Sequence, residues 1–395
     1  MVAAVFDEGM TINGTVAPGF EPVRAAFAEN FERHGDIGAA VAIYRDGRPV
    51  VDLWGGSADP ETGRPWERDT MVLVYSATKA VTATAAHLLA QRGVLDLDAP
   101  VASYWPEFAT AGKQEIPVRW LLAHRAGLPA LDRPVPVEDA LAWDPMIAAL
   151  AAQRPVWTPG AAHGYHGRTF GWLVGEVIRR VSGRSVGRVV AEEIAGPLGA
   201  DFFIGLPDSE RKRVARLVFA PKTDLSSVPL EAVPEELRPL VAAVQDPDSL
   251  FNRAFAVTDP DIDFTSAAVQ SAEIPSSNGI GTARGLARIY AALIGEVDGV
   301  RLLTAETLAD ATAEQAAGID RVTMIPDRYA SGYMLPAEGF GLGGPHSFGH
   351  PGRGGSLGFA DPTRGLAFAY VTNNIVEAAE DPRAVGLIAA LESAL

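Results

Sequence analysis

Strand-forming segments lie at both ends of this chain and a long helical block separates them, which restricts the folds it can adopt. Near the start, Ala39–Tyr44 and Pro49–Trp54 flank Asp46-Gly47, a strong hairpin signal, and Glu21–Gly35 before them has helical spacing. Near the end, a helix predicted from Thr282 precedes further strands and a closing helix. The strand-like runs are Tyr329–Leu335, His346–His350, Ser356–Ala360 and Leu366–Asn373, and the closing helix is Ala384–Leu395. This order predicts an α/β lobe built from both ends of the chain and interrupted by an α insert.

The central block has the composition of helices. Ser76–Arg92 is rich in Ala, lacks Pro and Gly, and is closed by Gly93. Helical patches alternate with Pro- and Gly-containing turns through residues 118–197, and Pro221–Phe264 is expected to be irregular or loosely helical. We therefore predict an α/β domain of residues 1–75 and 275–395, a mainly helical inserted domain of residues 76–274, and an active site at their interface.

Composition excludes several classes of function. The 395 residues are 48% hydrophobic and 21% charged, as expected of a core-forming globular protein. The net charge of −16 disfavours nucleic acid and anionic membrane surfaces as partners. With no cysteine, the chain has no thiol nucleophile, disulfide or thiolate metal site. Covalent chemistry would therefore use Ser, Thr, Lys or a carboxylate.

The first thirty residues do not resemble a secretory signal. Asp7 and Glu8 follow a short apolar stretch, without a basic region or a long apolar core. No stretch approaches the roughly 18–20 apolar residues that span a bilayer. We expect a cytoplasmic protein that binds no membrane.

The sharpest chemical signal is Ser76-Ala77-Thr78-Lys79 at the start of a predicted helix. One helical turn separates Ser76 from Lys79, so the amine can lie over the hydroxyl and accept its proton if burial lowers the lysine pKa. The alternative is an ordinary N-cap serine beside a surface lysine. A second match, Ser209 to Lys212, precedes a charged run and is interpreted as a solvent-facing helix start.

A Pro- and Gly-rich loop delivers Tyr165 just before another predicted helix. Held against the Ser76 and Lys79 pair, this tyrosine could pass a proton to a leaving group, although a packed aromatic residue is the alternative. Trp157 beside the loop could line an acyl pocket or pack under the loop.

The glycine-rich segment Phe348–Phe359 precedes a predicted strand. Its glycines could let substrate approach the backbone and direct an N–H at a developing oxyanion, or could simply form a hairpin. Gly354–Gly358 also matches G-x-S-x-G, but a strand and turn follow Ser356 where a nucleophile elbow needs a helix, so this match is interpreted as a decoy.

Taken in order, five segments resemble the serine β-lactamase-like superfamily, and most closely its family VIII carboxylesterases. The segments are Ser76–Lys79, Leu121–Leu128, the PGAAHGYH loop with Tyr165, Ser277–Tyr290 and His350–Gly355. The resemblance implies a β-lactamase/transpeptidase-like fold, with an antiparallel sheet flanked by helices and an inserted helical domain. It also implies that Ser76 is the acylated nucleophile, Lys79 its base and Tyr165 the second proton-transfer group.

Two departures from related class C β-lactamases bear on the substrate. His166-Gly167 follows Tyr165 where those enzymes have Y-x-N, and His350-Pro351-Gly352 replaces K-T-G. The missing amide and ammonium favour neutral esters over β-lactams. The resemblance implies two oxyanion donors, of which one is the Ser76 N–H. With the HPG alignment, the second donor is the Arg353 N–H. If Arg353-Gly354-Gly355 matches the W-G-G of some family members, the donor is the Ser356 N–H. His350, Gly352 and Gly355 are further candidate substrate-binding residues.

No cofactor or metal is expected. The seven histidines lack metal-ligand spacing, and His124 and His163 are interpreted as structural hydrogen-bonding residues. The favoured function is a serine carboxylesterase that hydrolyses small esters through an acyl-enzyme. The alternatives are acyl transfer, weak β-lactamase or D-amino-acid peptidase activity on the same site, and a non-catalytic penicillin-binding-like sensor.

Overall fold

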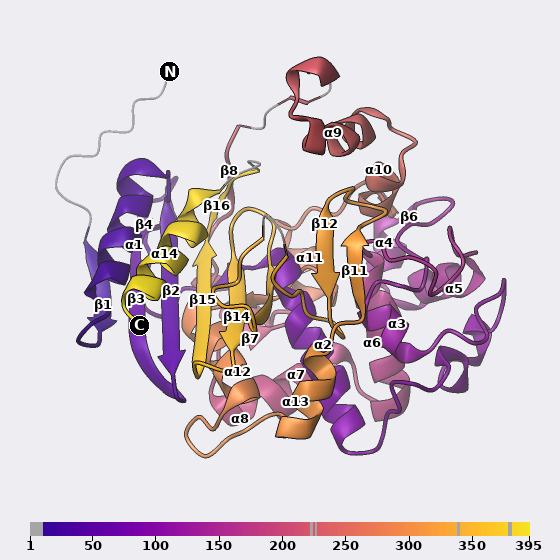
Figure 1. The fold of residues 1–395 in the computed structure, drawn as a ribbon, viewed down its shortest axis with the longest axis horizontal. Helices are drawn as coiled ribbons and strands as arrows, with labels where there is room; N and C mark the ends of the chain where they lie inside the picture. Colours follow the sequence, from indigo (N-terminus) through magenta and orange to yellow (C-terminus); the bar gives the residue numbers. More distant parts are fainter. Residues whose placement is uncertain (1–10, 222–223, 226, 338–339, 378–380) are drawn as a thin grey trace.

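A large antiparallel sheet joins the two ends of the chain. The structure is a computed structural model that describes residues 11–221, 224–225, 227–337, 340–377 and 381–395, so the prediction about the first residues lies largely outside it. The strand order is β1-β3-β2-β15-β14-β13, with β4 pairing β3, and Figure 1 shows β1, β3, β2, β15 and β14 side by side. The strands are β1 Ile12–Val16, β2 Gly38–Arg45, β3 Arg48–Asp59, β4 Arg64–Pro65, β13 Phe348–Pro351, β14 Leu357–Asp361 and β15 Leu366–Thr372. The predicted hairpin is β2–β3, and β15 pairs β2 at the centre of the sheet.

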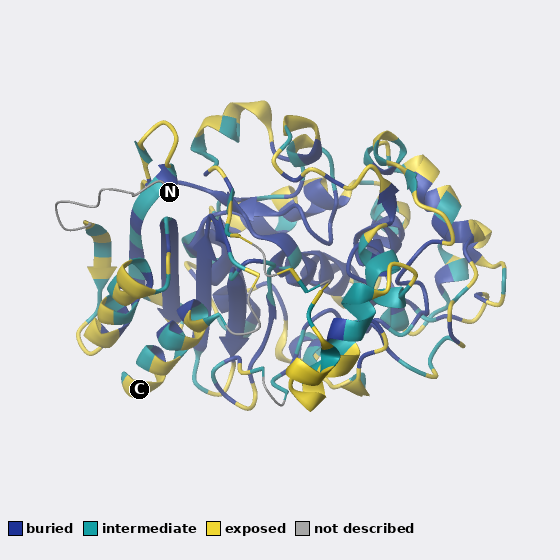
Figure 2. Ribbon diagram, turned by 90° about the horizontal axis from the view of Figure 1, so that it is seen from above, coloured by how far each residue is buried: buried dark blue, intermediate teal, exposed yellow. Residues whose placement is uncertain are grey.

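Helices cover both faces of this sheet. On one face, Phe368 and Tyr370 of β15 pack with α1 (Glu21–Arg33) and α14 (Pro382–Ser393). On the other face, Ala367 and Ala369 belong to the core that contains α12 (Ala283–Ile294). Small residues alternate with aromatic ones along β15, so α12 packs closely on one face while bulky side chains fill the other. Figure 2 shows the resulting layer of buried strands.

The rest of the described chain contributes further helices, several of which contact the buried helix α2 (Thr78–Gln91). They are α3 Val118–Leu122, α4 Val137–Leu141, α5 Asp144–Ala152, α6 Thr169–Ser182, α7 Val186–Val190, α8 Gly196–Leu198, α9 Arg238–Gln245, α10 Leu250–Phe255, α11 Ala267–Ser271 and α13 Ala305–Thr312. Every residue of α2 from Thr78 to Leu89 is buried, because Ala and Thr side chains allow neighbours to approach closely. The described parts of Pro221–Phe264 form short helices, as predicted. The domain limits at 75/76 and 274/275 stay a prediction.

Small sheets complete the architecture. A three-stranded sheet has the order β5-β10-β7, and three further pairs are β11–β12, β16–β8 and β6–β9. Their strands are β5 Val72–Leu73, β6 Val135–Pro136, β7 Phe202–Phe203, β8 Val218–Phe219, β9 Thr258–Asp259, β10 Ile280–Gly281, β11 Ala316–Ile319, β12 Pro326–Tyr329 and β16 Asn374–Ile375. Among the described residues, no helix has both the length and the apolar character needed to cross a bilayer.

One predicted strand is wrong. The run Tyr329–Leu335 leaves the extended conformation after Tyr329, where β12 ends. The Ala330 N–H donates to the Tyr333 carbonyl, and Gly332 has a φ of 88°, so the chain turns back on itself. Its alternating apolar residues are buried by this turn as well as they would be in a strand. The sequence pattern also missed β1 and β11.

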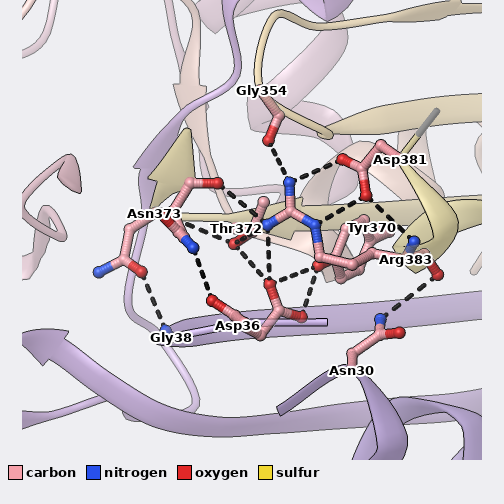
Figure 3. Close-up of polar contacts among 11 residues, drawn as sticks. Asn30, Asp36, Gly38, Gly354, Tyr370, Thr372, Asn373, Asp381 and Arg383 are labelled. Atoms are coloured by element: carbon pink, nitrogen blue, oxygen red, sulfur yellow. Dashed lines mark hydrogen bonds and ion pairs between the residues drawn. The ribbon is translucent and has the colours of Figure 1, made fainter. Parts of the chain in front are cut away.

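A buried polar network attaches α14 to the sheet (Figure 3). The Arg383 guanidinium pairs with Asp36, which also accepts hydrogen bonds from Tyr370 and Thr372. Arg383 donates further to the carbonyl of Gly354, at 2.8 Å. Burial raises the pKa of Asp36, whereas the charge of Arg383 lowers it. The network therefore fixes the glycine-rich turn between β13 and β14 from behind.

Candidate active site

Ser76 lies in a strained turn at the start of α2. It is the middle residue of a 3-10 turn, Tyr75–Ala77, that runs into the helix. The preceding residue, Tyr75, has a φ of 46°, in the left-handed region that costs a bulky residue roughly 1–3 kcal/mol. Thr78 holds this conformation, because its hydroxyl donates to the Tyr75 carbonyl and accepts the Gly279 N–H. The turn leaves Ser76 partly exposed beside the buried helix.

Lys79 is fully buried and faces Ser76. Its Nζ lies 3.1 Å from Ser76 Oγ and 2.9 Å from the carbonyl oxygens of Gly167 and Ser276. A neutral amine has two N–H donors and one lone pair. The two carbonyls accept the two donors, so the lone pair is free to accept the Ser76 proton. Lys79 Nζ also lies 4.7 Å from the centre of the Tyr165 ring.

Burial lowers the pKa of Lys79 well below the ordinary lysine value of 10.5, and the charge of Arg168 lowers it further. No carboxylate forms an ion pair with Lys79 among the described residues to oppose this shift. The amine is therefore suited to accept a proton, as the Ser-x-x-Lys spacing predicts.

Tyr165 is the third member of the cluster. Burial raises the pKa of its hydroxyl, and a side-chain interaction with Ser76 lowers it. Its loop is held by His124, whose carbonyl accepts the Gly164 N–H at 3.1 Å and whose Nδ1 accepts the His166 N–H at 3.1 Å. The structure therefore brings together all three residues predicted to carry out the chemistry.

His350 faces the same cluster from β13. Its ring centre lies 6.0 Å from that of Tyr165. Nδ1 lies 2.7 Å from the Pro351 carbonyl and must donate to it, so Nε2 carries the lone pair; Nε2 has no partner among the described residues. Burial, then the charge of Lys79, lowers the pKa of His350 to about 3. His350 is therefore neutral at pH 7 and supplies no cation to a substrate.

The glycine-rich turn abuts the nucleophile. A Cβ on Gly352 would lie 2.1 Å from the Val74 carbonyl oxygen, so only glycine fits there. The N–H groups of Gly352 and Gly355 donate within the turn. The N–H groups of Arg353 and Ser356 stay the two candidates for the second oxyanion donor. Ser356 is 2% exposed and strand β14 follows it, which argues against a nucleophile elbow.

The structure also places Trp157 and the second Ser-x-x-Lys match. Trp157 packs under the Tyr165 loop, where a Cβ on Gly164 would lie 2.7 Å from its ring. Ser209 and Lys212 are exposed on a 3-10 helix, Asp208–Arg213, although Ser209 lies inside it and Pro207 is the N-cap.

One cluster has the side chains to hold a cation. The ligand atoms of His163, Asp320 and Asp327 lie within 4.8 Å of one another, and the described residues contain no other such group. His163 Nε2 lies 2.9 Å from Asp327 Oδ1, so these two side chains already satisfy one another. The cluster joins the β11–β12 hairpin to the Tyr165 loop, which fits the structural role predicted for His163.

Arg168 was not predicted from the sequence. It is 7% exposed and lies near the site formed by Ser76, Lys79 and Tyr165. It is the N-cap residue of α6, where the helix dipole disfavours a cation. A basic residue at a predicted helix start, three positions after the key tyrosine, was the available signal. The Gly167 and Ser276 carbonyls were missed because a backbone group leaves no mark in the sequence.

The chain is similar to known proteins along most of its length. A family model described as Beta-lactamase matches residues 23–392. The chain is 37% identical over 375 residues to Esterase/beta-lactamase LipL of Mycobacterium tuberculosis, covering 94% of this chain and 85% of that protein. A crystal structure of a family VIII carboxylesterase is 38% identical with a TM-score of 0.86, covering 98% of this chain and all (100%) of that one. A penicillin-binding protein homologue from Caulobacter crescentus is 39% identical with a TM-score of 0.85, covering 98% and 100%.

Proposed function

The chain belongs to the beta-lactamase family, and from this membership we propose that it is a serine carboxylesterase that works through an acyl-enzyme on Ser76. The family and the fold class predicted from the sequence are thereby confirmed. Relatives whose names or titles include an esterase, LipL and the family VIII carboxylesterase, support hydrolysis of small carboxylic esters.

The observation that carries the proposal is the set of three neighbours around Lys79. Two carbonyls hold the amine, and its remaining position faces Ser76 Oγ at 3.1 Å. Ser76 Oγ attacks the ester carbonyl carbon while its proton moves to Lys79 Nζ. The carbonyl oxygen becomes an oxyanion, bound by the Ser76 N–H and by the N–H of Arg353 or Ser356.

Tyr165 completes the acylation step. The tetrahedral intermediate collapses by breaking the bond to the alcohol oxygen, and the Tyr165 hydroxyl gives that oxygen a proton. Lys79, now protonated, returns a proton to Tyr165, so acylation leaves both groups as they began. Water then attacks the acyl-enzyme, and Lys79 and Tyr165 together act as the general base. This step releases the acid and restores Ser76. The two groups titrate as a coupled pair.

The test is rapid mixing with a p-nitrophenyl ester of a short acid. We expect a burst of p-nitrophenol equal to the enzyme concentration, and an intact mass increased by one acyl group mapped to Ser76. A Ser76→Ala protein that keeps full turnover would refute the proposal. Failure of a fluorophosphonate probe to label the folded protein would favour a non-catalytic sensor.

Opening of β-lactams is a second candidate, because the name of the LipL relative includes beta-lactamase. The same acyl-enzyme would form on a β-lactam, but the Y-x-N amide is replaced here by Gly167. A β-lactam included in the mass experiment tests this candidate, and competing alcohols test acyl transfer.

A further inference from the structure

Arg168 is a buried cation that contacts an aromatic ring, that of Phe264, and lacks polar partners among the described residues. Its guanidinium makes no hydrogen bond or ion pair with any described residue, and its Nε is fully buried and unsatisfied. The other deeply buried arginine, Arg383, pairs with Asp36 and Asp381 and donates to two carbonyls. An unpaired buried charge is costly, so a fold keeps one where a ligand completes it or where function needs it.

The Arg168 guanidinium is linked by its contacts to residues that adjoin the nucleophile. Arg168 Cζ is 4.7 Å from the Phe264 ring centre, and the Phe264 ring is 5.2 Å from that of Tyr75. On the other side, Arg353 Cζ is 5.7 Å from the Tyr75 ring. Each guanidinium thus contacts one ring of an edge-to-face aromatic pair, of which Tyr75 directly precedes Ser76. Gly167, which binds Lys79, directly precedes Arg168.

The guanidiniums of Arg168 and Arg353 differ in whether an acidic side chain pairs with their charge. Arg353 forms an ion pair with Glu377, so its charge is matched. Asp261 is exposed and forms no ion pair with Arg168 among the described residues. His350, which replaces the class C lysine in the HPG alignment, is neutral. Arg168 is therefore the cation beside Ser76 that is left for a substrate.

We propose that Arg168 binds an anionic group of the substrate, so that the enzyme prefers esters that carry a free carboxylate close to the bond it cleaves. A carboxylate can accept two parallel hydrogen bonds from a guanidinium, which would pair the charge of Arg168. The proposal rests on the proposed esterase function and revises the expectation of neutral substrates. That expectation considered the Y-x-N and K-T-G positions, and Arg168 lies at neither.

The test uses pairs of esters that differ by one charge. The acyl-side pair is 4-nitrophenyl hydrogen glutarate and 4-nitrophenyl methyl glutarate. The alcohol-side pair is the butyrate ester of 3-hydroxybenzoate and that of methyl 3-hydroxybenzoate. We expect kcat/KM for the anionic member of at least one pair to exceed that of its neutral partner by about 10-fold or more, mainly through KM, and the ratio to fall with added salt.

Variants assign the preference to Arg168. In Arg168→Gln the anionic-to-neutral ratio should fall by about 10- to 100-fold, and Arg168→Lys should restore part of it. Arg180→Gln is the matched control, because Arg180 also lies near an aromatic ring, at 5.7 Å from Trp105, but is paired with Glu176 and Glu107. Its ratio should equal that of the parent protein.

The outcomes separate this inference from the proposed function. Hydrolysis of neutral esters with no anionic preference in either pair overturns the role of Arg168 and leaves the esterase intact. An unchanged ratio in Arg168→Gln does the same, even if the parent protein prefers anions. If no ester of either pair is cleaved, the proposed function fails first. If Arg168→Gln does not fold, Arg168→Lys takes its place, and an anionic-to-neutral ratio equal to that of the parent protein then overturns the role of Arg168.

Discussion

Among the described residues, two lysines are buried in nearly the same way, and one of them has no catalytic geometry. Lys113 donates to the carbonyls of Ala151 and Gln153 and lies 5.1 Å from the Phe108 ring, as Lys79 donates to two carbonyls beside Tyr165. A hydroxyl residue, Thr110, precedes Lys113 by three positions, repeating the spacing of the Ser76 pair.

The two sites differ in where the hydroxyl points. Thr110 Oγ1 donates to the Ala151 carbonyl, 2.7 Å away, which also accepts from Lys113. Ser76 Oγ instead lies 3.1 Å from the amine. Burial lowers the pKa of Lys113 to about 8, and it lowers the pKa of Lys79 well below 10.5. Burial therefore lowers a lysine pKa at both sites, and the three-residue spacing is common to both. A nucleophile needs, in addition, an amine directed at the hydroxyl.

The largest expected difference between the sites follows from removing each hydroxyl. Ser76→Ala should lower kcat by about 10⁴-fold or more because the covalent step is lost, whereas Thr110→Val should stay within about threefold of the parent. Steady-state hydrolysis of a p-nitrophenyl ester measures both. Comparable losses in the two variants would remove the distinction drawn here.

Removing each amine should separate the sites again. Lys79→Met should lower kcat by about 10³-fold because Ser76 loses its base, and burst kinetics should show slow acylation. Lys113→Met should retain turnover while losing stability, because two carbonyls lose their donor. A Lys79→Met protein with a normal burst would mean that another group accepts the proton.

The lowered pKa of Lys113 should make the free energy of unfolding depend on pH. Its folded pKa is about 8 and its unfolded pKa is near 10.5, so between these values the unfolded chain binds more protons and stability rises with pH. We expect a gain of about 2 kcal/mol across this window, allowing for nearby solvent. Urea unfolding at about pH 7.5 and about pH 10 should show the gain in the parent and not in Lys113→Met.

The smallest expected effect is that of Arg168 on the pH dependence of kcat/KM. The charge of Arg168 lowers the Lys79 pKa, so Arg168→Gln should move the acid limb of kcat/KM to higher pH by about one unit or less. Arg180→Gln should leave the limb in place. A shift to lower pH would show that Arg168 does not oppose protonation of this amine.

The sequence predicted the parts of the fold that depend on local patterns. The Asp46-Gly47 turn, with φ values of 50° and 73°, forms the expected hairpin, and α12 begins after its N-cap Thr282. The run from Tyr329 failed because burial in a turn and in a strand requires the same apolar residues. Strand β1 was missed because its alternating burial comes from pairing with β3, a distant contact.

At the site, side chains could be predicted and backbone partners could not. Ser76, Lys79 and Tyr165 carry spacing and family resemblance, and the structure brings them together. The carbonyls of Gly167 and Ser276 that direct the lysine depend on how distant loops pack. The pairing of His163 with Asp327 likewise joins residues 164 positions apart.

The pairing of β15 with β2 also dictates when the enzyme can begin to work. During translation Ser76 and Lys79 leave the ribosome early, but Leu366–Thr372 must still be made before the central strand can enter beside Gly38–Arg45. At about 5–20 residues per second, this interval lasts roughly 15 to 60 seconds. A nascent or prematurely terminated chain would hold its serine and lysine without the strand that completes the sheet, and should have no esterase activity.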